Sequence, residues 1–237
     1  MTFESQSESS VTPTEDVTDD ATTEDTAVDD AATDFDQDDS MVGTIPIVRL
    51  GHPALRTSAE PVPREQLADP EVQTLIDDML TTMEAASGVG LAAPQVGLGW
   101  QLFVYAAVDP DSEEGFEDAE RKVLVNPAVE PAPGELVYDW EGCLSIPDLR
   151  GLVPRHPEVR VHALDRHGEP ISFVASGYEA RIVQHEFDHL NGIVFLDRMR
   201  DFRSLAFEEE WEEFMTEGGG DDRDDLDRDD EDEASTD

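Results

Sequence analysis

Gln184-His185-Glu186-Phe187-Asp188-His189-Leu190 carries two histidines four positions apart, with a glutamate directly after the first. On a helix this spacing places both imidazoles on one face, one turn apart, where they can share a metal ion. Glu186 then lies beside the metal and can take a proton from a water molecule. Surface helices also carry such patterns without binding a metal, so the remainder of the sequence has to distinguish a metal-binding helix from a chance pattern.

The residues around this motif have the signals of a buried helix. Ser176 and Glu179 have the spacing of a capping box, and Asn191-Gly192 provides a stop. Apolar residues dominate between these ends: Ala180, Ile182, Val183 and Phe187. A buried helix needs partners for its two imidazoles and its carboxylate, since burying them unpaired is costly. Metal coordination supplies such partners, so a central metal-binding helix is predicted.

The other segments predict an α+β domain, with mainly antiparallel sheets packed around the central helix that carries the HExxH motif. In residues 69–86 apolar side chains recur at three- and four-residue intervals, which indicates an amphipathic helix. A last helix is expected over residues 204–214, docked on the domain without a part in catalysis. Short strands are expected at residues 102–107, 122–125, 135–138, 158–164 and 170–175.

Charge divides the chain into three regions. Residues 1–40 contain 14 acidic residues and no Lys or Arg, and residues 217–237 contain 12 acidic residues and two arginines. Neither region has the apolar periodicity needed to offset the entropy of ordering. We therefore predict acidic disordered tails at 1–40 and 217–237, a catalytic domain at 41–216 and a surface loop at 109–119.

The predicted domain is itself strongly acidic. Residues 41–216 carry 32 acidic and 13 basic residues, a net charge of −19, and Lys122 is the only lysine of the chain. Such a surface disfavours nucleic acid and anionic membranes as partners. It indicates a protein that stays hydrated where salt screens its self-repulsion, as in the cytoplasm of a halophile. Residues 1–10 lack the features of a signal peptide and no segment is long enough to span a bilayer, which favours a cytoplasmic location.

Removal of salt is accordingly expected to unfold the domain, because the repulsion among its carboxylates then acts over longer distances without screening. Thermal melts followed by circular dichroism across a KCl series measure this effect. As a control, NaCl at the same ionic strength should give the same melting temperature. A domain that is fully stable without salt would contradict the salt adaptation.

Cys143 is the only cysteine, so the chain has no internal disulfide framework. It lies in a predicted loop or strand end. A catalytic metal commonly has three protein ligands and one open position, and Cys143 would add a thiolate to the two imidazoles. The alternative third ligand is a glutamate from residues 208–210, which follow His189 at the distance found in thermolysin-like peptidases. These glutamates belong to an acidic run that is typical of a solvated face, which favours Cys143.

Gly88-Val89-Gly90-Leu91-Ala92-Ala93-Pro94-Gln95 is a run of small residues between the first predicted helix and the first predicted strand. Its glycines provide either a tight turn or a loop that lets the backbone of a ligand come close. In the second case Gln95, the single side-chain amide of the run, can point at the ligand.

This run and two other segments resemble, in order, the three signature motifs of the peptide deformylase family. The other two segments are Glu141-Gly142-Cys143-Leu144-Ser145 and the HExxH stretch from Gln184 to His189. The resemblance extends over about residues 45–198. It implies one divalent metal ion bound by Cys143, His185 and His189, with ferrous iron as the usual ion of the family. Imidazole and thiolate ligands also suit Zn²⁺, Ni²⁺ and Co²⁺.

The resemblance further implies removal of the N-formyl group from the N-terminal formyl-methionine of new polypeptides, with release of formate. Glu186 would take the proton of the attacking water and return it to the departing amine. The metal, the backbone N–H of Leu144 and the side-chain amide of Gln95 would stabilise the oxyanion. Gly90 would let the substrate backbone approach, and Arg150 is a candidate for ordering the site. The expected partner is an N-formylated nascent polypeptide or formyl-peptide.

Two other activities remain open. The first is hydrolysis of another N-formyl amide, because initiator methionine is not expected to be formylated if the salt-adapted composition points to an archaeon. The second is a metallopeptidase with Glu209 as third ligand. An inactive binding module is disfavoured, since the candidate metal ligands and Glu186 are all intact. The sequence makes no prediction of the oligomeric state.

Overall fold

The structure, a computed structural model, describes residues 43–108 and 119–215. The predicted acidic tails at 1–40 and 217–237, and nearly all of the predicted loop at 109–119, lie outside these residues. The disorder of the tails and the domain boundaries therefore stay predictions.

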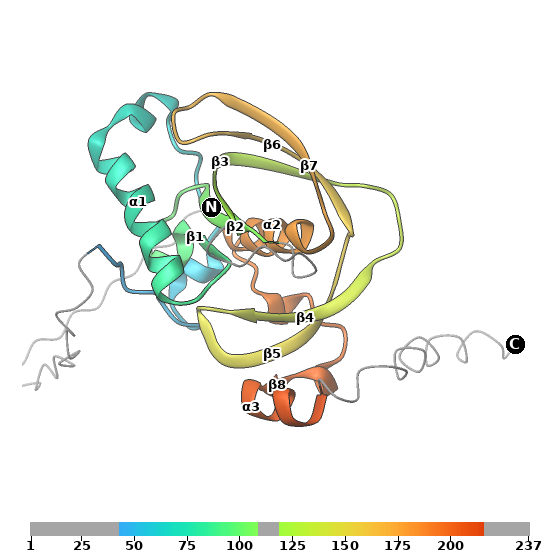
Figure 1. The fold of residues 1–237 in the computed structure, drawn as a ribbon. Coiled ribbons are helices and arrows are strands. Elements are labelled where there is room, and N and C mark those ends of the chain that lie inside the picture. Colours follow the sequence, from blue (N-terminus) through green and yellow to red (C-terminus); the bar gives the residue numbers. More distant parts are fainter. Residues whose placement is uncertain (1–42, 109–118, 216–237) are drawn as a thin grey trace, which may run out of the picture. The chain divides into compact units, whose positions relative to one another are not determined.

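Two antiparallel sheets lie around a central helix, which confirms the predicted α+β class (Figure 1). The strand order is β1-β2-β3-β6-β7 in the larger sheet and β4-β5-β8 in the smaller one. The strands are β1 (Gly90–Ala92), β2 (Leu102–Ala107), β3 (Glu120–Pro131), β4 (Val137–Cys143), β5 (Ile146–Arg155), β6 (Glu158–Leu164), β7 (Pro170–Ser176) and β8 (Ala206–Phe207). The helices are α1 (Pro70–Ala85), α2 (Gly177–Leu190) and α3 (Glu208–Glu210), which continues into a π-helical turn at Trp211–Met215.

Helix α2 carries the HExxH motif through the centre of the fold, between the larger sheet and the β4-β5 hairpin (Figure 1). Nine of its 14 residues are buried. Its apolar residues share one core cluster with residues of the larger sheet: Ala180, Ile182, Val183 and Leu190 with Phe103, Leu124 and Val159. The predicted buried central helix is therefore confirmed.

The N-terminus of α2 lies where it is predicted, but the capping-box hydrogen bonds do not form. Ser176 occupies the N-cap position, and its side chain makes no capping hydrogen bond. Glu179 points to the larger sheet instead, where its Oε1 accepts hydrogen bonds from the Tyr105 hydroxyl and the Lys122 ammonium, both at 2.9 Å. The sheet offers Glu179 stronger donors, one of them charged, than the local backbone N–H.

Helix α1 begins and ends within one residue of its predicted range. The Asp69 side chain caps it by accepting a hydrogen bond from the backbone N–H of Glu71 at 3.1 Å, and Pro70 takes the first helical position. The buried face of α1 covers β2 in a second core cluster through Val72, Ile76, Met79 and Met83. The predicted amphipathic helix is confirmed.

Strand β5 has no counterpart among the predicted strands, whereas β2 and β6 match theirs. Pro147, Gly151 and Pro154 interrupt any alternation of apolar and polar residues in β5. The strand forms because it pairs with β4 along the hairpin, from Val137 opposite Arg155 down to Cys143 opposite Ile146. Cys143 thus stands at the strand end where it is expected.

The run of small residues is more ordered than the loop that is predicted. It forms β1, which pairs with β2 at one edge of the larger sheet, and a 3-10 helix at Ala93–Val96. Gly97 follows with a φ of 80°, a left-handed conformation that favours glycine. Gln95 therefore sits on a fixed backbone.

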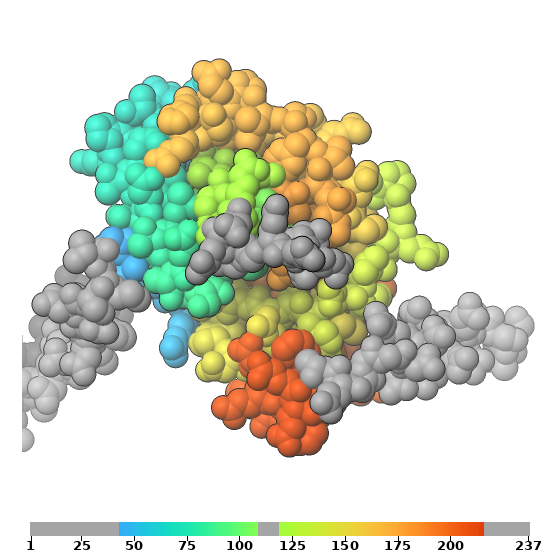
Figure 2. Space-filling view, viewed as in Figure 1, coloured from blue at the N-terminus to red at the C-terminus, as the bar shows by residue number. Residues whose placement is uncertain are grey.

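The predicted helix over residues 204–214 is wrong in its first part. Ala206–Phe207 form β8, which pairs with Leu149 and Arg150 of β5, and helical structure starts only at Glu208. The edge of β5 offers these residues backbone partners that an early helix would forgo. Figure 2 shows this C-terminal segment, in red, against the yellow surface of the smaller sheet. The predicted docking on the domain is confirmed.

Within residues 43–108 and 119–215, none of the helices combines the length and the apolar character that a bilayer crossing requires.

Candidate metal centre

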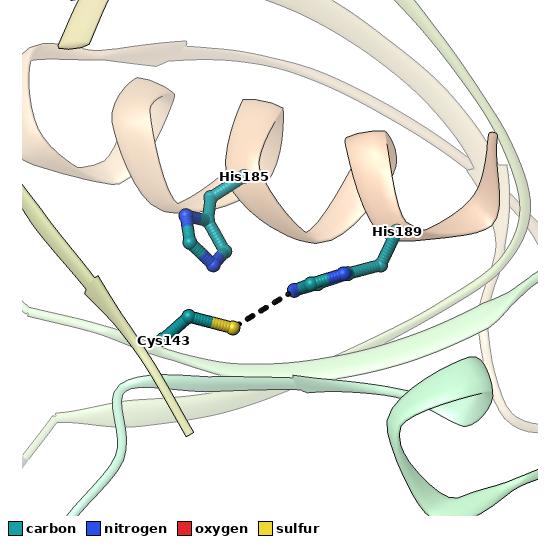
Figure 3. Close-up of side chains that lie close together, drawn as sticks. All are labelled: Cys143, His185 and His189. Carbon is teal, nitrogen blue, oxygen red and sulfur yellow. Dashed lines mark hydrogen bonds between the residues drawn. The ribbon is translucent and has the colours of Figure 1, made fainter. Parts of the chain in front are cut away.

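The fold brings Cys143, His185 and His189 together from two elements. Both imidazoles point from α2 toward Cys143 at the end of β4 (Figure 3). The atoms that could ligate a metal all lie within 4.8 Å of one another. The Sγ of Cys143 lies 3.4 Å from Nε2 of His189, and the two imidazole rings meet edge to face with centroids 5.1 Å apart. One thiol and two imidazoles thus converge, as a site with three protein ligands requires.

The glutamates at 208–210 do not join this cluster. In the part of the chain that the structure describes, Cys143 and the two histidines form the one group of three ligating side chains close enough to hold a metal. The Oε1 of Glu208 instead accepts hydrogen bonds from Arg150, with Nε at 3.1 Å and with Nη2 as a second donor. The geometry favours Cys143 over a glutamate as the third ligand.

The donor set fits a transition-metal ion. A thiolate and two imidazole nitrogens suit Fe²⁺, Zn²⁺, Co²⁺ and Ni²⁺. His189 is fully buried, and burial holds its pKa well below the usual range, so the ring is neutral and can ligate. Cys143 is free of any disulfide. A buried polar cluster of this kind is costly without partners, and one metal ion would supply them.

Glu141, to which the sequence assigns no role, fixes the orientation of His185. Its Oε2 accepts a hydrogen bond from Nδ1 of His185 at 2.9 Å, which leaves Nε2 for a metal. Burial alone would raise the pKa of Glu141, yet hydrogen bonds with Arg155 and His185 hold it well below the usual range. Glu141 opens the second signature motif, but nothing in the local sequence shows that its carboxylate binds His185 on another element.

His185 itself shows how metal binding and protonation compete. Burial alone would lower its pKa, but hydrogen bonds with Cys143 and Glu141 raise it well above the usual range. The protonated form of His185 is therefore favoured when no metal is bound. Metal binding must displace this proton, since only the thiolate and the neutral imidazole ligate.

Glu186 lies at the same site with a carboxylate that is not paired. It is 4 % exposed, and its Oε2 has no hydrogen-bond partner within residues 43–108 and 119–215. Burial raises its pKa to about 7, a value that suits a group which first accepts and then returns a proton. Gly90 makes room for it, since a Cβ there would lie 2.3 Å from Oε1 of Glu186. The role of Gly90 in substrate approach stays a prediction.

Gln95 points its amide group at the candidate metal ligands. Its Oε1 accepts a hydrogen bond from the backbone N–H of Ala92 at 2.7 Å, which fixes the side chain. The Nε2 then lies 3.6 Å from Sγ of Cys143 and 3.4 Å from Oγ of Ser145. Leu144, between these two residues, lines the same cavity. The predicted oxyanion donors are therefore close to the cluster.

A cavity of about 430 Å³ opens onto these residues, a size within the range of small-ligand sites. Most of its walls come from three places: residues 86–90, the β4-β5 hairpin between Trp140 and Arg150, and α2 between Tyr178 and Glu186. Gln95 lines it as well. Strands β1 and β4 are edge strands of the two sheets. An extended peptide in the cavity can therefore form backbone hydrogen bonds with a strand edge.

Arg150 and Glu208 also line this cavity. The Arg150 guanidinium lies over the Trp211 ring at 5.3 Å from its centroid, in addition to its pairing with Glu208. The C-terminal segment thus holds Arg150 in place and supplies part of the cavity wall. The expectation that this segment only docks on the domain is incomplete.

Comparison with known proteins identifies the family. The family model described as polypeptide deformylase matches residues 44–204. Peptide deformylase 2 of Ralstonia nicotianae is 44 % identical over 167 residues, which cover 69 % of this chain and 92 % of the relative. Peptide deformylase 1 of Streptomyces coelicolor is 45 % identical over 169 residues, which cover 69 % of this chain and 77 % of the relative.

Solved structures give the same result. A peptide deformylase from Synechococcus elongatus in complex with actinonin is 42 % identical with a TM-score of 0.61, covering 69 % of this chain and 84 % of that one. A class I type b peptide deformylase from Acinetobacter baumannii with bound Met-Ala-Ser is 39 % identical with a TM-score of 0.60, covering 67 % of this chain and 99 % of that one. The family match extends over strands β1 to β7, the central helix and the three motifs that build the cavity. On this ground the chain belongs to the polypeptide deformylase family.

Proposed function

We propose that Cys143, His185 and His189 hold one divalent metal ion and that Glu186 transfers the proton while the chain removes the N-formyl group from new polypeptides. The substrate is a polypeptide that begins with formyl-methionine, and the products are formate and a free amino terminus. The observation that carries the proposal is the convergence of three ligating atoms within 4.8 Å beside Glu186, whose Oε2 has no hydrogen-bond partner among the described residues.

The residues of the cavity divide the chemistry among them. When bound, the metal supplies a Lewis acid and lowers the pKa of a water molecule. Glu186 takes a proton from the attacking water and delivers it to the departing amine, as a general acid–base group does. The Gln95 amide and the backbone N–H of Leu144 donate hydrogen bonds to the oxygen that becomes negative as the formyl carbon turns tetrahedral.

The peptide part of the substrate lies along the strand edges. Residues 86–90 and the end of β4 both border the cavity, so an extended chain in it can pair with a strand edge. The relative from Acinetobacter baumannii binds Met-Ala-Ser, and we expect a peptide that begins with methionine to occupy this cavity. A reaction on nascent chains supports a cytoplasmic location, and we propose that neither nucleic acid nor a membrane is a direct partner.

Ferrous iron is the proposed native metal, and Zn²⁺, Ni²⁺ and Co²⁺ are the competitors that the ligand set admits. The test of the function is metal analysis of anaerobically purified protein together with a formate-release assay in high salt. Formyl-Met peptides and unrelated N-formyl amines are compared side by side. Turnover of the second group alone would reject the proposed substrate and support hydrolysis of another N-formyl amide.

Replacing Cys143 with serine tests the third ligand. In the cobalt-substituted wild type we expect a thiolate charge-transfer band and tight binding, because sulfur is bound to the ion. Cys143→Ser should lose the band and weaken Co²⁺ binding, which a competing chelator measures. His162→Ala, on the exposed face of β6, is the matched control and should leave both unchanged. A band that survives in Cys143→Ser would show that another residue is the ligand.

A further inference from the structure

We infer that Arg181 is a positioning residue that fixes the distance between the strand carrying Cys143 and the helix carrying the two histidines. This inference rests on the proposed metal site. Arg181 lies on α2 one turn before His185, so that Arg181, His185 and His189 share one face of the helix. Its side chain is 7 % exposed.

The guanidinium of Arg181 joins α2 to the β4-β5 hairpin at several points. Its Nη1 donates to Oε1 of Glu141 at 2.8 Å and to the Val153 carbonyl at 2.9 Å. Its Nη2 donates to the Val137 carbonyl at 2.8 Å, and the Asp139 carbonyl lies 3.4 Å from Nη1. A planar guanidinium with several acceptors in fixed directions holds the two elements at one separation.

The irregular end of β4 makes this connection necessary. The register of the β4-β5 pairing shifts between Glu141 and Cys143, so the regular ladder ends just before the cysteine. Arg181 binds β4 at Val137, Asp139 and Glu141, the residues that precede this shift. Beside the Asp188–Arg155 ion pair, which joins α2 to β5, Arg181 is therefore the contact from α2 that fixes the part of β4 leading to Cys143.

Arg181 also acts on the second ligand through Glu141. The same carboxylate accepts the hydrogen bond from Nδ1 of His185, so Arg181 and His185 bind opposite oxygens of one group. Because the guanidinium is occupied by these acceptors, it has little capacity left to bind a substrate, although the residue lines the cavity. Its contribution is to the geometry of the ligands and not to contact with the formyl group.

Two substitutions separate this role from simple neutralisation of Glu141. Arg181→Lys keeps a positive charge beside Glu141 but carries its donors on a single nitrogen, whereas the guanidinium bonds the Val153 and Val137 carbonyls from two different nitrogens. Arg181→Met removes both the charge and the hydrogen bonds. Arg160→Met, an exposed arginine on β6, is the control.

The experiment measures Co²⁺ affinity by chelator competition and the thiolate charge-transfer band in the full-length protein, with urea unfolding as a check of the fold. We expect Arg181→Lys and Arg181→Met to bind Co²⁺ about 10- to 100-fold more weakly and to show a weaker, shifted band, as when groups that orient ligands are removed. The control should match the wild type.

Wild-type affinity and an unchanged band in Arg181→Lys would overturn the inference, because charge alone would then suffice. If Arg181→Met does not fold, the comparison of Arg181→Lys with the wild type decides. A wild-type protein that binds no Co²⁺ would instead refute the metal site on which the inference rests.

Discussion

Replacing Glu186 with glutamine is expected to remove most turnover and at the same time to stabilise the metal-free protein. Glutamine has nearly the same shape but cannot accept and return a proton, so the rate should fall by about 10²- to 10⁴-fold, the usual contribution of a general acid–base group. Metal binding should persist, since Glu186 is not among the three ligating residues. Formate release and Co²⁺ affinity measure these two effects.

The gain in stability follows from the raised pKa. Burial raises the pKa of Glu186 from 4.5 to about 7, so the folded state pays for ionising a group that ionises freely in the unfolded state. The stability of the folded state that depends on a neutral Glu186 is fully present below pH 4.5 and is lost as the pH rises through about 7. That shift corresponds to about 3 kcal/mol at pH 8, a loss that a neutral glutamine avoids.

Urea unfolding of the chelator-treated proteins, at constant KCl, tests this pH dependence. Glu186→Gln should be more stable than the wild type by about 1 to 3 kcal/mol at pH 8, the lower value allowing for an imperfectly bonded amide. The difference should shrink as the pH falls toward 5. Adding Co²⁺ provides the control, because a nearby cation stabilises the carboxylate and should reduce the gain. Equal stability of the two metal-free proteins at pH 8 would exclude a charged, unpaired Glu186.

Local patterns were sufficient where the structure depends on local geometry. The four-residue spacing of His185 and His189 needs only a helix to bring the rings together, and the stop signals at Asn191-Gly192 place the end of α2 correctly. Cys143 is predictable because it is the only thiol of the chain and because the competing glutamates at 208–210 belong to an acidic run that is typical of a solvated face. Helix α1 is predictable as well, because its apolar residues recur at the spacing of one helix face.

Long-range partners explain what the sequence did not reveal. Glu141, Arg155 and Arg181 meet although 14 to 40 positions separate them, and no local pattern pairs one acidic residue with one arginine among so many. Strand β5 exists because β4 is beside it, despite its two prolines. Glu179 does not form the predicted capping box, because the fold brings Tyr105 and Lys122 within hydrogen-bond distance although both are remote in sequence.

Replacing Arg155 with methionine is expected to cost about 3 to 5 kcal/mol of unfolding free energy, because it leaves two buried carboxylates without their shared partner. Arg155, on β5, donates from Nε and Nη2 to the two oxygens of Glu141, both at 2.9 Å, and from Nη1 to Asp188 at 2.5 Å. All three side chains are about 5 % exposed, so water cannot replace the lost bonds. Urea unfolding at constant KCl measures the loss.

Arg198→Met is the matched control, since Arg198 binds the same Asp188 from the surface with a side chain that is 46 % exposed. It should cost no more than about 1 kcal/mol, the usual range for an exposed ion pair. Equal costs for the two variants would mean that the buried network contributes no more than a surface pair.

The comparison also bears on the site, because Arg155, Glu141 and Asp188 come from β5, β4 and α2. The β4-β5 hairpin and α2 also carry Cys143, His185 and His189, so the arginine that stabilises the fold holds the same elements that must meet at the metal.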